Sequence, residues 1–116
     1  MDIEEYRDFC LSKLLVTESL PFDEKTLVFK VGGKMFALTN LENFESINLK
    51  CNPERAIDLR EKYSDIKPGY HMSKIHWNTV TVNNQLTDAL VLELINHSYD
   101  LVFDSLPKAI KEGIKY

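Results

Sequence analysis

The sequence contains few cysteines, and it has no long uninterrupted run of apolar residues. Its 116 residues include two cysteines, four glycines and one tryptophan. No segment approaches the roughly 18 consecutive apolar residues of a membrane-spanning helix, so we expect no membrane association. Cys10 and Cys51 stand far apart and match no metal-ligand spacing. We therefore expect buried, reduced thiols, without a disulfide, a bound metal or a cofactor.

The remaining composition is typical of a globular protein. Hydrophobic residues make up 44% of the chain and charged residues 28%. A chain of this length buries roughly two-thirds of the surface that its unfolded form exposes. We expect one domain over residues 1–116. The N-terminal residues 1–5 are acidic where a signal peptide is basic and then apolar, which predicts a cytoplasmic protein.

The charge is distributed unevenly along the chain. The net charge of −4 argues against indiscriminate binding to a polyanion. Residues 25–80 nevertheless carry nine lysines and arginines against six acidic residues. A locally basic surface on an acidic protein is one interpretation of this segment. A solvated face of scattered lysines is the other.

The first half of the chain predicts one helix followed by three strands. Apolar residues at helical spacing predict a helix from about residue 3 to about residue 14. The apolar runs 27–31 and 34–38 are separated by Gly32-Gly33, which predicts a hairpin because a two-residue turn needs positive φ at both positions. Residues 46–51 alternate between polar and apolar side chains, which indicates a half-buried antiparallel strand.

A second helix and one or two further strands are predicted next. Asn52 suits an N-cap, and Pro53 suits the first helical position, where no amide proton is needed. The basic side chains of this helix should project outward: Arg55, Arg60 and Lys62. Residues 70–77 should be extended, and residues 78–82 should continue as a strand with a bulge or break near Asn78.

The last third of the chain predicts the most buried helix. Asn83-Asn84 should turn the chain, and Thr87 or Asp88 should cap a helix with a wide apolar stripe. Residues 108–112 should add one helical turn before Gly113. The predicted fold class is α+β, a two-layer α-β3-α-β(1–2)-α arrangement with an antiparallel sheet and helices packed on one face.

Several segments of the chain resemble the bacterial MmcQ/YjbR family. These segments are residues 22–31, 33–37, 47–51, 97–99, Pro68-Gly69-Tyr70-His71 and His76-Trp77-Asn78-Thr79-Val80. The resemblance runs from about Tyr6 to about Ile110 and implies the compact fold of type III secretion chaperones, α-β3-α-β2-α. The sequence departs from the family at Leu14-Leu15, where the family commonly has Pro-Gly at the end of its first helix.

The segment 68–80 is the best candidate for a binding site. It holds the only tryptophan, two of the three histidines, a tyrosine and a lysine at a loop-to-strand junction. The candidate residues for contact with nucleic acid or another partner are Lys34, Lys50, Arg55, Lys62, Tyr70, His71, Lys74, His76, Trp77 and Asn78. The basic side chains would take phosphates, while Tyr70 and Trp77 would stack.

Each of these candidates also has a structural interpretation. A lone tryptophan at a sheet edge is more often a core or rim anchor, and a solvated face is the default for the lysines. His97 lies on the apolar stripe of the last helix, which predicts a hydrogen-bonded, largely buried histidine. His71 and His76 stand five residues apart without further ligands at a useful spacing, so we expect no zinc site.

The sequence predicts a binding protein without enzymatic activity. No serine or cysteine stands in a recognisable nucleophile context. Members of the family are often described as DNA-binding because the fold has been described as a double-wing arrangement, and the resemblance therefore implies DNA binding. The alternative is a protein- or peptide-binding, chaperone-like module that uses the exposed face of the sheet.

Overall fold

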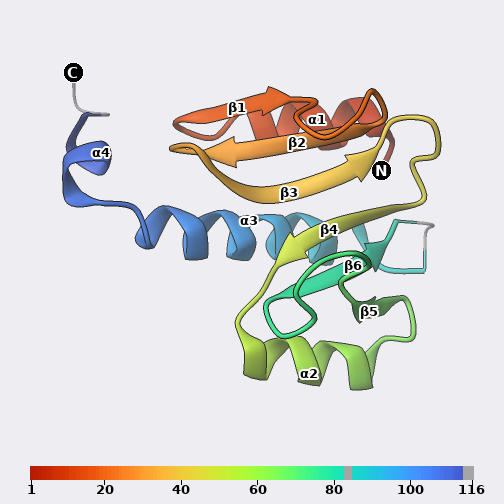
Figure 1. Cartoon of the computed structure of the whole chain (residues 1–116). Coiled ribbons are helices and arrows are strands. Elements are labelled where there is room, and N and C mark those ends of the chain that lie inside the picture. The colour runs from red at the N-terminus through yellow and green to blue at the C-terminus, as the bar shows by residue number, and fades with distance from the viewer. Residues whose placement is uncertain (83–84, 114–116) are drawn as a thin grey trace.

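The structure, a computed structural model, describes residues 1–82 and 85–113. In chain order the elements are α1 (Ile3–Leu11), β1 (Val16–Ser19), β2 (Thr26–Val31), β3 (Lys34–Asn40), β4 (Ser46–Lys50), α2 (Pro53–Lys62), β5 (Ile66–Pro68), β6 (Trp77–Thr81), α3 (Asp88–Asp104) and α4 (Lys108–Gly113). The described residues form a six-stranded antiparallel sheet in the order β1-β2-β3-β4-β6-β5 (Figure 1). No helix in these ranges is long and apolar enough to cross a membrane.

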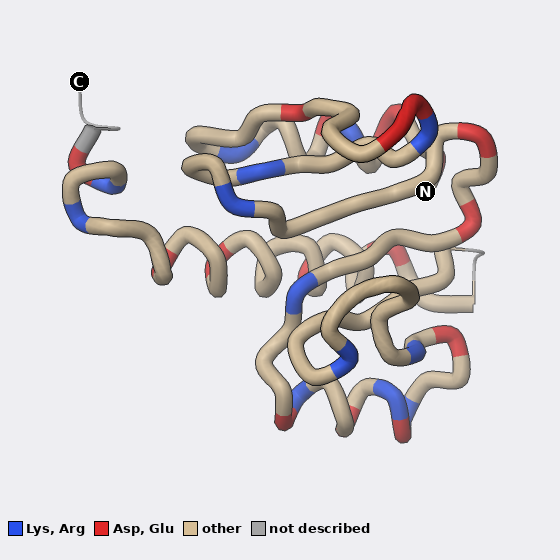
Figure 2. Tube along the Cα trace, viewed as in Figure 1, with Lys and Arg blue, Asp and Glu red and all other residues tan. Residues whose placement is uncertain are grey.

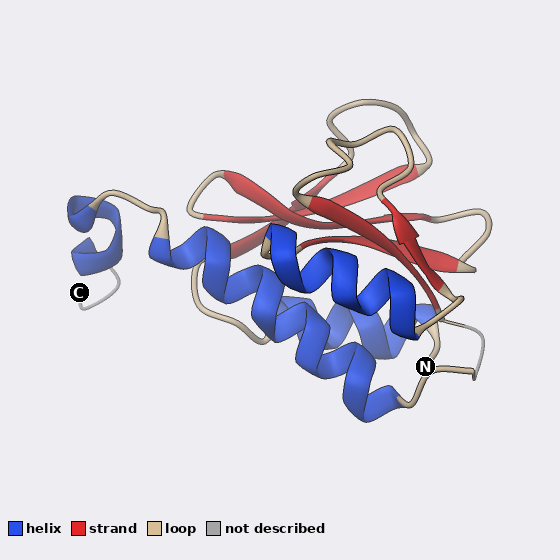
Figure 3. Cartoon of the chain, turned by 90° about the horizontal axis from the view of Figure 1, so that it is seen from below, coloured by secondary structure: helices blue, strands red, loops and turns tan. Residues whose placement is uncertain are grey.

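Helices α1, α2 and α3 pack on one face of the sheet, which confirms the predicted α+β class (Figure 3). Helix α3 lies against β3 and β4, α2 lies against β5 and β6, and α1 lies against β1. The core between the layers contains fully buried aromatic side chains, among them Tyr6, Phe29 and Phe36. The rings of Tyr6 and Phe29 meet edge to face, with their centroids 5.4 Å apart. Each such side chain contributes about 1.5–3 kcal/mol through burial of apolar surface.

The capping signals at the starts of the helices behave as the sequence predicts. The side chains of Asp2 and Glu5 form a capping box on α1. The side chain of Asn52 caps α2, whose first residue is Pro53, and the side chain of Thr87 caps α3. The short helix α4 is also as predicted, whereas the predicted turn at Asn83-Asn84 lies outside the described residues.

Helix α1 ends three residues earlier than predicted, and a strand that the sequence did not reveal follows it. Ser12 is the C-cap of the helix, and three residues later Leu15 adopts a positive φ of 63° as the chain turns toward β1. The chain then enters β1, whose polar residues give little strand signal. Tertiary contacts hold β1 in place: it pairs with β2, and the carboxylate of Glu18 accepts a hydrogen bond from Nε of Arg7 in α1 at 2.7 Å.

The β2–β3 hairpin turns at Gly32 and Gly33, as predicted, with φ of 56° and 86°. A β-bulge does occur in the sheet, but it lies in this hairpin. The ladder pairs Phe29 with Ala37 and Lys30 with Met35, which leaves Phe36 as the extra residue. The bulge lets both Phe36 and its neighbour Ala37 be fully buried.

The predicted bulge near Asn78 is wrong, because β6 pairs with β4 without any shift in register. Asn78 faces the helices together with Val80 and is only 2% exposed. Arg60 of α2 satisfies the oxygen of this buried amide, because its Nε donates to Oδ1 of Asn78 at 2.7 Å, while Nδ2 of Asn78 has no partner among the described residues. Arg60 therefore points inward, and the prediction that it projects outward is wrong.

The prediction of an extended chain over residues 70–77 is also wrong. The short edge strand β5 comes first, and residues 69–76 then form a compact loop that we call the 69–76 loop. The amide of Trp77 donates to the carbonyl of Ser73 at 3.0 Å, which closes the loop. A Cβ atom on Gly69 would lie 2.7 Å from Cβ of Trp77, so the loop begins where only glycine fits.

Candidate functional site

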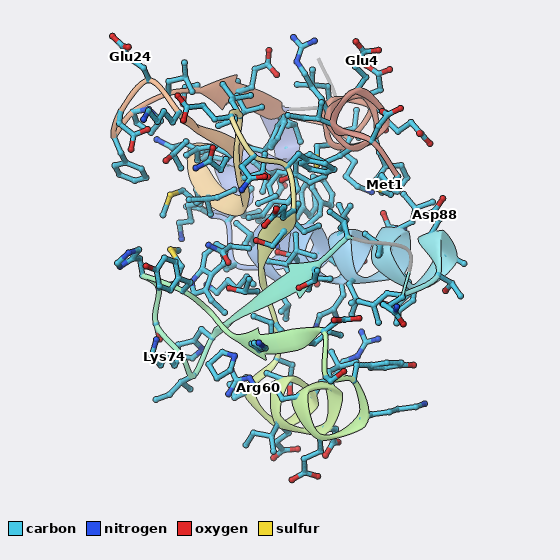
Figure 4. All side chains as sticks on the ribbon, turned by 90° about the vertical axis from the view of Figure 1, so that its right-hand side faces the viewer. Met1, Glu4, Glu24, Arg60, Lys74 and Asp88 are labelled. Atoms are coloured by element: carbon cyan, nitrogen blue, oxygen red, sulfur yellow. The ribbon has the colours of Figure 1, made fainter. Side chains whose placement is uncertain are left out.

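The face of the sheet opposite the helices, which we call the open face, carries a groove of about 730 Å³. Its floor is formed by β3, β4 and β6. Its two walls are residues 20–25, which we call the 20–25 loop, and the 69–76 loop. Glu24 and Lys74 mark these two loops in Figure 4, where both extend from the same side of the sheet. The groove therefore lies between two segments that are far apart in the sequence.

The floor of the groove is apolar on one side and polar on the other. Leu38 of β3 lies opposite Asn48 of β4, which in turn lies opposite Thr79 of β6. Met35 and Met72 extend the apolar part. Strand alternation directs these side chains away from the helices, so the open face has its own small apolar cluster beside amide and hydroxyl groups.

Hydrogen bonds fasten the 69–76 loop to the polar part of the floor. The hydroxyl of Thr79 donates to Oδ1 of Asn48 at 2.6 Å and accepts from the amide of Tyr70 at 2.9 Å. Nδ2 of Asn48 donates to the carbonyl of Tyr70 at 3.4 Å. The backbone of Tyr70 is therefore held in place while its ring remains free to contact a ligand.

Each wall of the groove presents an exposed aromatic ring. Phe22 of the 20–25 loop is 64% exposed, and Tyr70 of the 69–76 loop is 68% exposed. The ring of Tyr70 lies against the imidazole of His71, with the ring centroids 4.0 Å apart. Exposed rings beside an apolar floor are typical of recognition surfaces, because aromatic side chains contribute strongly to binding when a partner covers them.

The structure brings part of the predicted site together on the open face. Tyr70 and His71 line the groove, and Lys50 lies on the same face opposite Trp77 in the ladder. Trp77 itself is 8% exposed and packs with Val28 and Leu38. Trp77 thus anchors the open face beneath the loop and leaves little of its ring for stacking on a ligand.

Other predicted residues lie elsewhere or have structural contacts. Arg55 forms an ion pair with Glu93 of α3, and Nζ of Lys62 lies 5.4 Å from the centroid of the Tyr63 ring. Nζ of Lys74 donates to the carbonyl of Gly69 at 3.3 Å, within its own loop. The remaining three lie in three different places: Lys34 at the exposed hairpin end, His76 in the exposed turn before β6, and Asn78 against the helices. The ten residues do not form one surface.

Several residues of the groove were not identified from the sequence as site residues. They are Phe22, Asp23, Met35, Leu38, Glu45 and Thr79. Phe22 directly follows Pro21 outside the predicted helix and strands, and this could have indicated an exposed ring in the 20–25 loop. The others lie on strands or loops whose proximity follows only from the strand order, which local periodicity does not reveal.

The groove carries more negative than positive charge. Asp23 and Glu45 line it, whereas no lysine or arginine among the described residues does. Backbone amides of Lys25 and Thr26 donate to the Asp23 carboxylate at 2.8 and 2.7 Å and hold its pKa below the usual value. This carboxylate therefore remains ionised at neutral pH.

Among the described residues, the two thiols are buried, and the potential metal ligands do not cluster. Cys10 and Cys51 are free and buried, as the sequence predicts. Burial raises the pKa of Cys10 to about 12, so its thiol stays protonated at neutral pH. Within residues 1–82 and 85–113, no group of three His, Cys, Asp or Glu side chains is placed to hold a metal ion.

The fold and the groove define a two-layer α+β protein whose sheet is covered on one face and open on the other. The sequence profile of the YjbR family matches residues 11–101. The chain therefore belongs to the YjbR family, as the resemblance predicts.

Known relatives and solved structures agree with this membership. The chain is 41% identical over 96 residues to the uncharacterized protein YbdF of Escherichia coli O157:H7, covering 82% of this chain and 79% of that protein. It is 34% identical over 109 residues to the uncharacterized protein YjbR of Escherichia coli K12, covering 93% and 92%. A crystal structure of a Deinococcus radiodurans protein matches with a TM-score of 0.92 and 37% identity, covering 97% of this chain and 87% of that one.

Proposed function

We propose that this protein is a non-catalytic binding module that holds an extended segment of a partner protein in the groove of the open face. The observation that carries this proposal is the pair of exposed rings, Phe22 and Tyr70, on opposite walls above the apolar floor. A bound segment would cover both rings and place an apolar side chain against Leu38.

The shape of the groove favours a polypeptide over a small molecule. Sites for small molecules enclose most of the ligand surface. Here the groove is open to solvent, and its two aromatic rings are each about two-thirds exposed. The backbone of a bound segment would lie beside the polar part of the floor, while its side chains would meet the apolar part. A chaperone-like role would use the same contacts.

DNA is the second candidate ligand, and a specific observation favours it. Lys30 and Lys50 lie on the open face, and among the described residues neither has a carboxylate within ion-pair distance. Such free ammonium groups are suited to phosphate contacts. The carboxylates of Asp23 and Glu45 in the groove disfavour a polyanion, so we place DNA second.

We propose that the protein catalyses no reaction and that it acts in the cytoplasm. The groove is lined mainly by amide, hydroxyl, thioether and aromatic groups, which recognise ligands rather than activate them. The buried free thiols of Cys10 and Cys51 are consistent with a reducing compartment.

A peptide selection tests the proposal directly. The wild-type protein is used to enrich a displayed library of random heptapeptides, and the recovered peptides are measured by fluorescence anisotropy. The double variant Phe22→Ser, Tyr70→Ser should bind these peptides at least about tenfold more weakly, because it removes both aromatic contacts. The matched control Leu14→Ser, Ile57→Ser removes two apolar side chains outside the groove that are also more than half exposed, and it should bind as the wild type does.

The same assay separates the two candidate ligands. A labelled duplex of about 20 base pairs is titrated at about 50 mM and about 200 mM salt. DNA binding predicts a duplex affinity that falls steeply with salt and is lost in the double variant Lys30→Ala, Lys50→Ala. If that result is obtained, and no selected peptide depends on Phe22 and Tyr70, DNA binding replaces the peptide proposal.

A further inference from the structure

The open face carries charges of opposite sign at its two ends. Asp23 and Glu45 line the groove at the end where β2 and β4 begin. Lys30 and Lys50 lie on the same face near the ends of those strands, as the alternation of side chains along each strand requires. Figure 2 shows mainly acidic residues, with one basic segment beside them, at the right-hand end of the sheet and basic residues at its left-hand end.

Most of these charges are not neutralised inside the protein. In the described part of the chain, no ion pair involves Lys30, Lys50 or Glu45. Asp23 uses its oxygens for hydrogen bonds to backbone amides of its own loop and keeps its negative charge. A bound segment therefore meets a negative end and a positive end that can each select a charge of opposite sign.

The apolar part of the floor lies between the two charged ends. Along β4, the step from Ser46, which lines the groove, to Lys50 covers four residues, or about 14 Å at roughly 3.4 Å per residue. An extended peptide covers the same length between its positions i and i+4. Its side chains at i, i+2 and i+4 all point to one side, so three consecutive same-side residues meet the negative end, the apolar floor and the positive end.

We propose that the groove, together with Lys30 and Lys50 on the open face beyond its lining, selects extended segments with a basic, a bulky apolar and an acidic residue at alternate positions. This inference rests on the proposed function, because it specifies the partner that the same groove holds. The basic residue lies at the Asp23 and Glu45 end, the apolar residue lies on Leu38 between the two aromatic rings, and the acidic residue lies at the Lys50 end.

Four labelled peptides of matched length test this inference by fluorescence anisotropy. The first places Lys, Leu and Glu at alternate positions with serine between and around them. The second moves Glu by one position, which keeps composition and net charge but turns its carboxylate to the opposite side. The third and fourth carry two Lys or two Glu around the same Leu. The first peptide should bind roughly fivefold to tenfold more tightly than any other.

Charge reversal provides the decisive variant. In the double variant Lys30→Glu, Lys50→Glu, both ends of the open face are negative, so the peptide with two Lys should bind most tightly. The control Lys62→Glu on α2 should leave the order of the four peptide affinities unchanged. If all four peptides bind with equal affinity, and the double variant Phe22→Ser, Tyr70→Ser binds them more weakly, the charge rule is wrong but the peptide-binding function is retained. Binding that is no weaker in that aromatic variant would overturn both.

Discussion

At the scale of single residues, two non-glycine residues in the described part of the chain have the left-handed backbone conformation that favours glycine. Leu15 has a φ of 63° and His71 a φ of 59°. The left-handed conformation costs a non-glycine residue about 1–2 kcal/mol. His71 lines the groove, where such strain is held by the hydrogen bonds of the 69–76 loop. Leu15 lies outside the groove, in the turn between α1 and β1.

Leu15→Gly should therefore stabilise the protein. The substitution removes the steric strain, and the larger backbone entropy of glycine in the unfolded chain offsets part of the gain. We expect the free energy of unfolding to rise by about 0.5–1 kcal/mol, measured by urea denaturation. Leu14→Gly is the matched control, because Leu14 is also exposed but has no positive φ, and it should be neutral or destabilising. A loss of stability in Leu15→Gly would contradict this account.

At the scale of elements, Arg60 connects α2 to the strand and loop that build one wall of the groove. Its guanidinium donates to Oδ1 of Asn78 and to the carbonyls of Lys74 and Trp77. These three acceptors lie at the end of the 69–76 loop and the start of β6. The position of the wall therefore depends on a side chain from the layer on the other face of the sheet.

Arg60→Ala should loosen this wall. It leaves the buried Oδ1 of Asn78 without a donor, which costs about 1–3 kcal/mol of stability. Amide hydrogen exchange at Trp77 and Tyr70 should accelerate more than exchange in β2, because these two amides tie the loop and β6 together: Trp77 donates to Ser73 of the loop, and Tyr70 donates to Thr79 of β6. Lys62→Ala, an exposed change on the same helix, is the control. Uniform acceleration across the sheet would show that Arg60 serves global stability only.

At the scale of the whole molecule, helices α2 and α3, which are far apart in the sequence, are joined by a histidine that accepts a hydrogen bond. Nε2 of His97 in α3 accepts from the amide of Asn52 at the start of α2, at 3.2 Å. Burial lowers the pKa of His97, and the nearby Arg55 lowers it further, while Glu93 and Asp100 act in the opposite direction. The folded protein thus binds a proton at His97 less readily than the unfolded chain does.

This depressed pKa makes the stability of the whole molecule depend on pH in one direction. His97 contributes fully to stability above the unfolded pKa of about 6.5, and the contribution decreases as the pH falls toward the folded pKa. The thermal midpoint should therefore fall between pH 7.5 and pH 5.5. In His97→Gln, which has an acceptor but does not titrate, the fall should be smaller. Identical falls in both proteins would remove His97 as the cause.

The sequence by itself determined the features that depend on neighbouring residues. The capping box at Asp2 and Glu5, the turn at Gly32-Gly33 and the alternation of 46–51 all act over a few residues, and all are present as predicted. Together they were enough for the α+β class and for the two-layer order. The crowding of aromatic, imidazole and ammonium groups in 68–80 also singled out Tyr70 and His71, which line the groove, but the predicted extended chain there is the 69–76 loop.

Only the tertiary structure decided which side chains share the groove. Alternation alone gave conflicting signals at Asn78, and the conflict is resolved by Arg60, 18 residues away in the chain. Phe22 and Tyr70 face one groove because the strand order places their loops above the same floor. The physical reason is that local signals act through hydrogen bonds and steric limits between near neighbours, whereas strand order depends on burying the apolar faces of all elements at once.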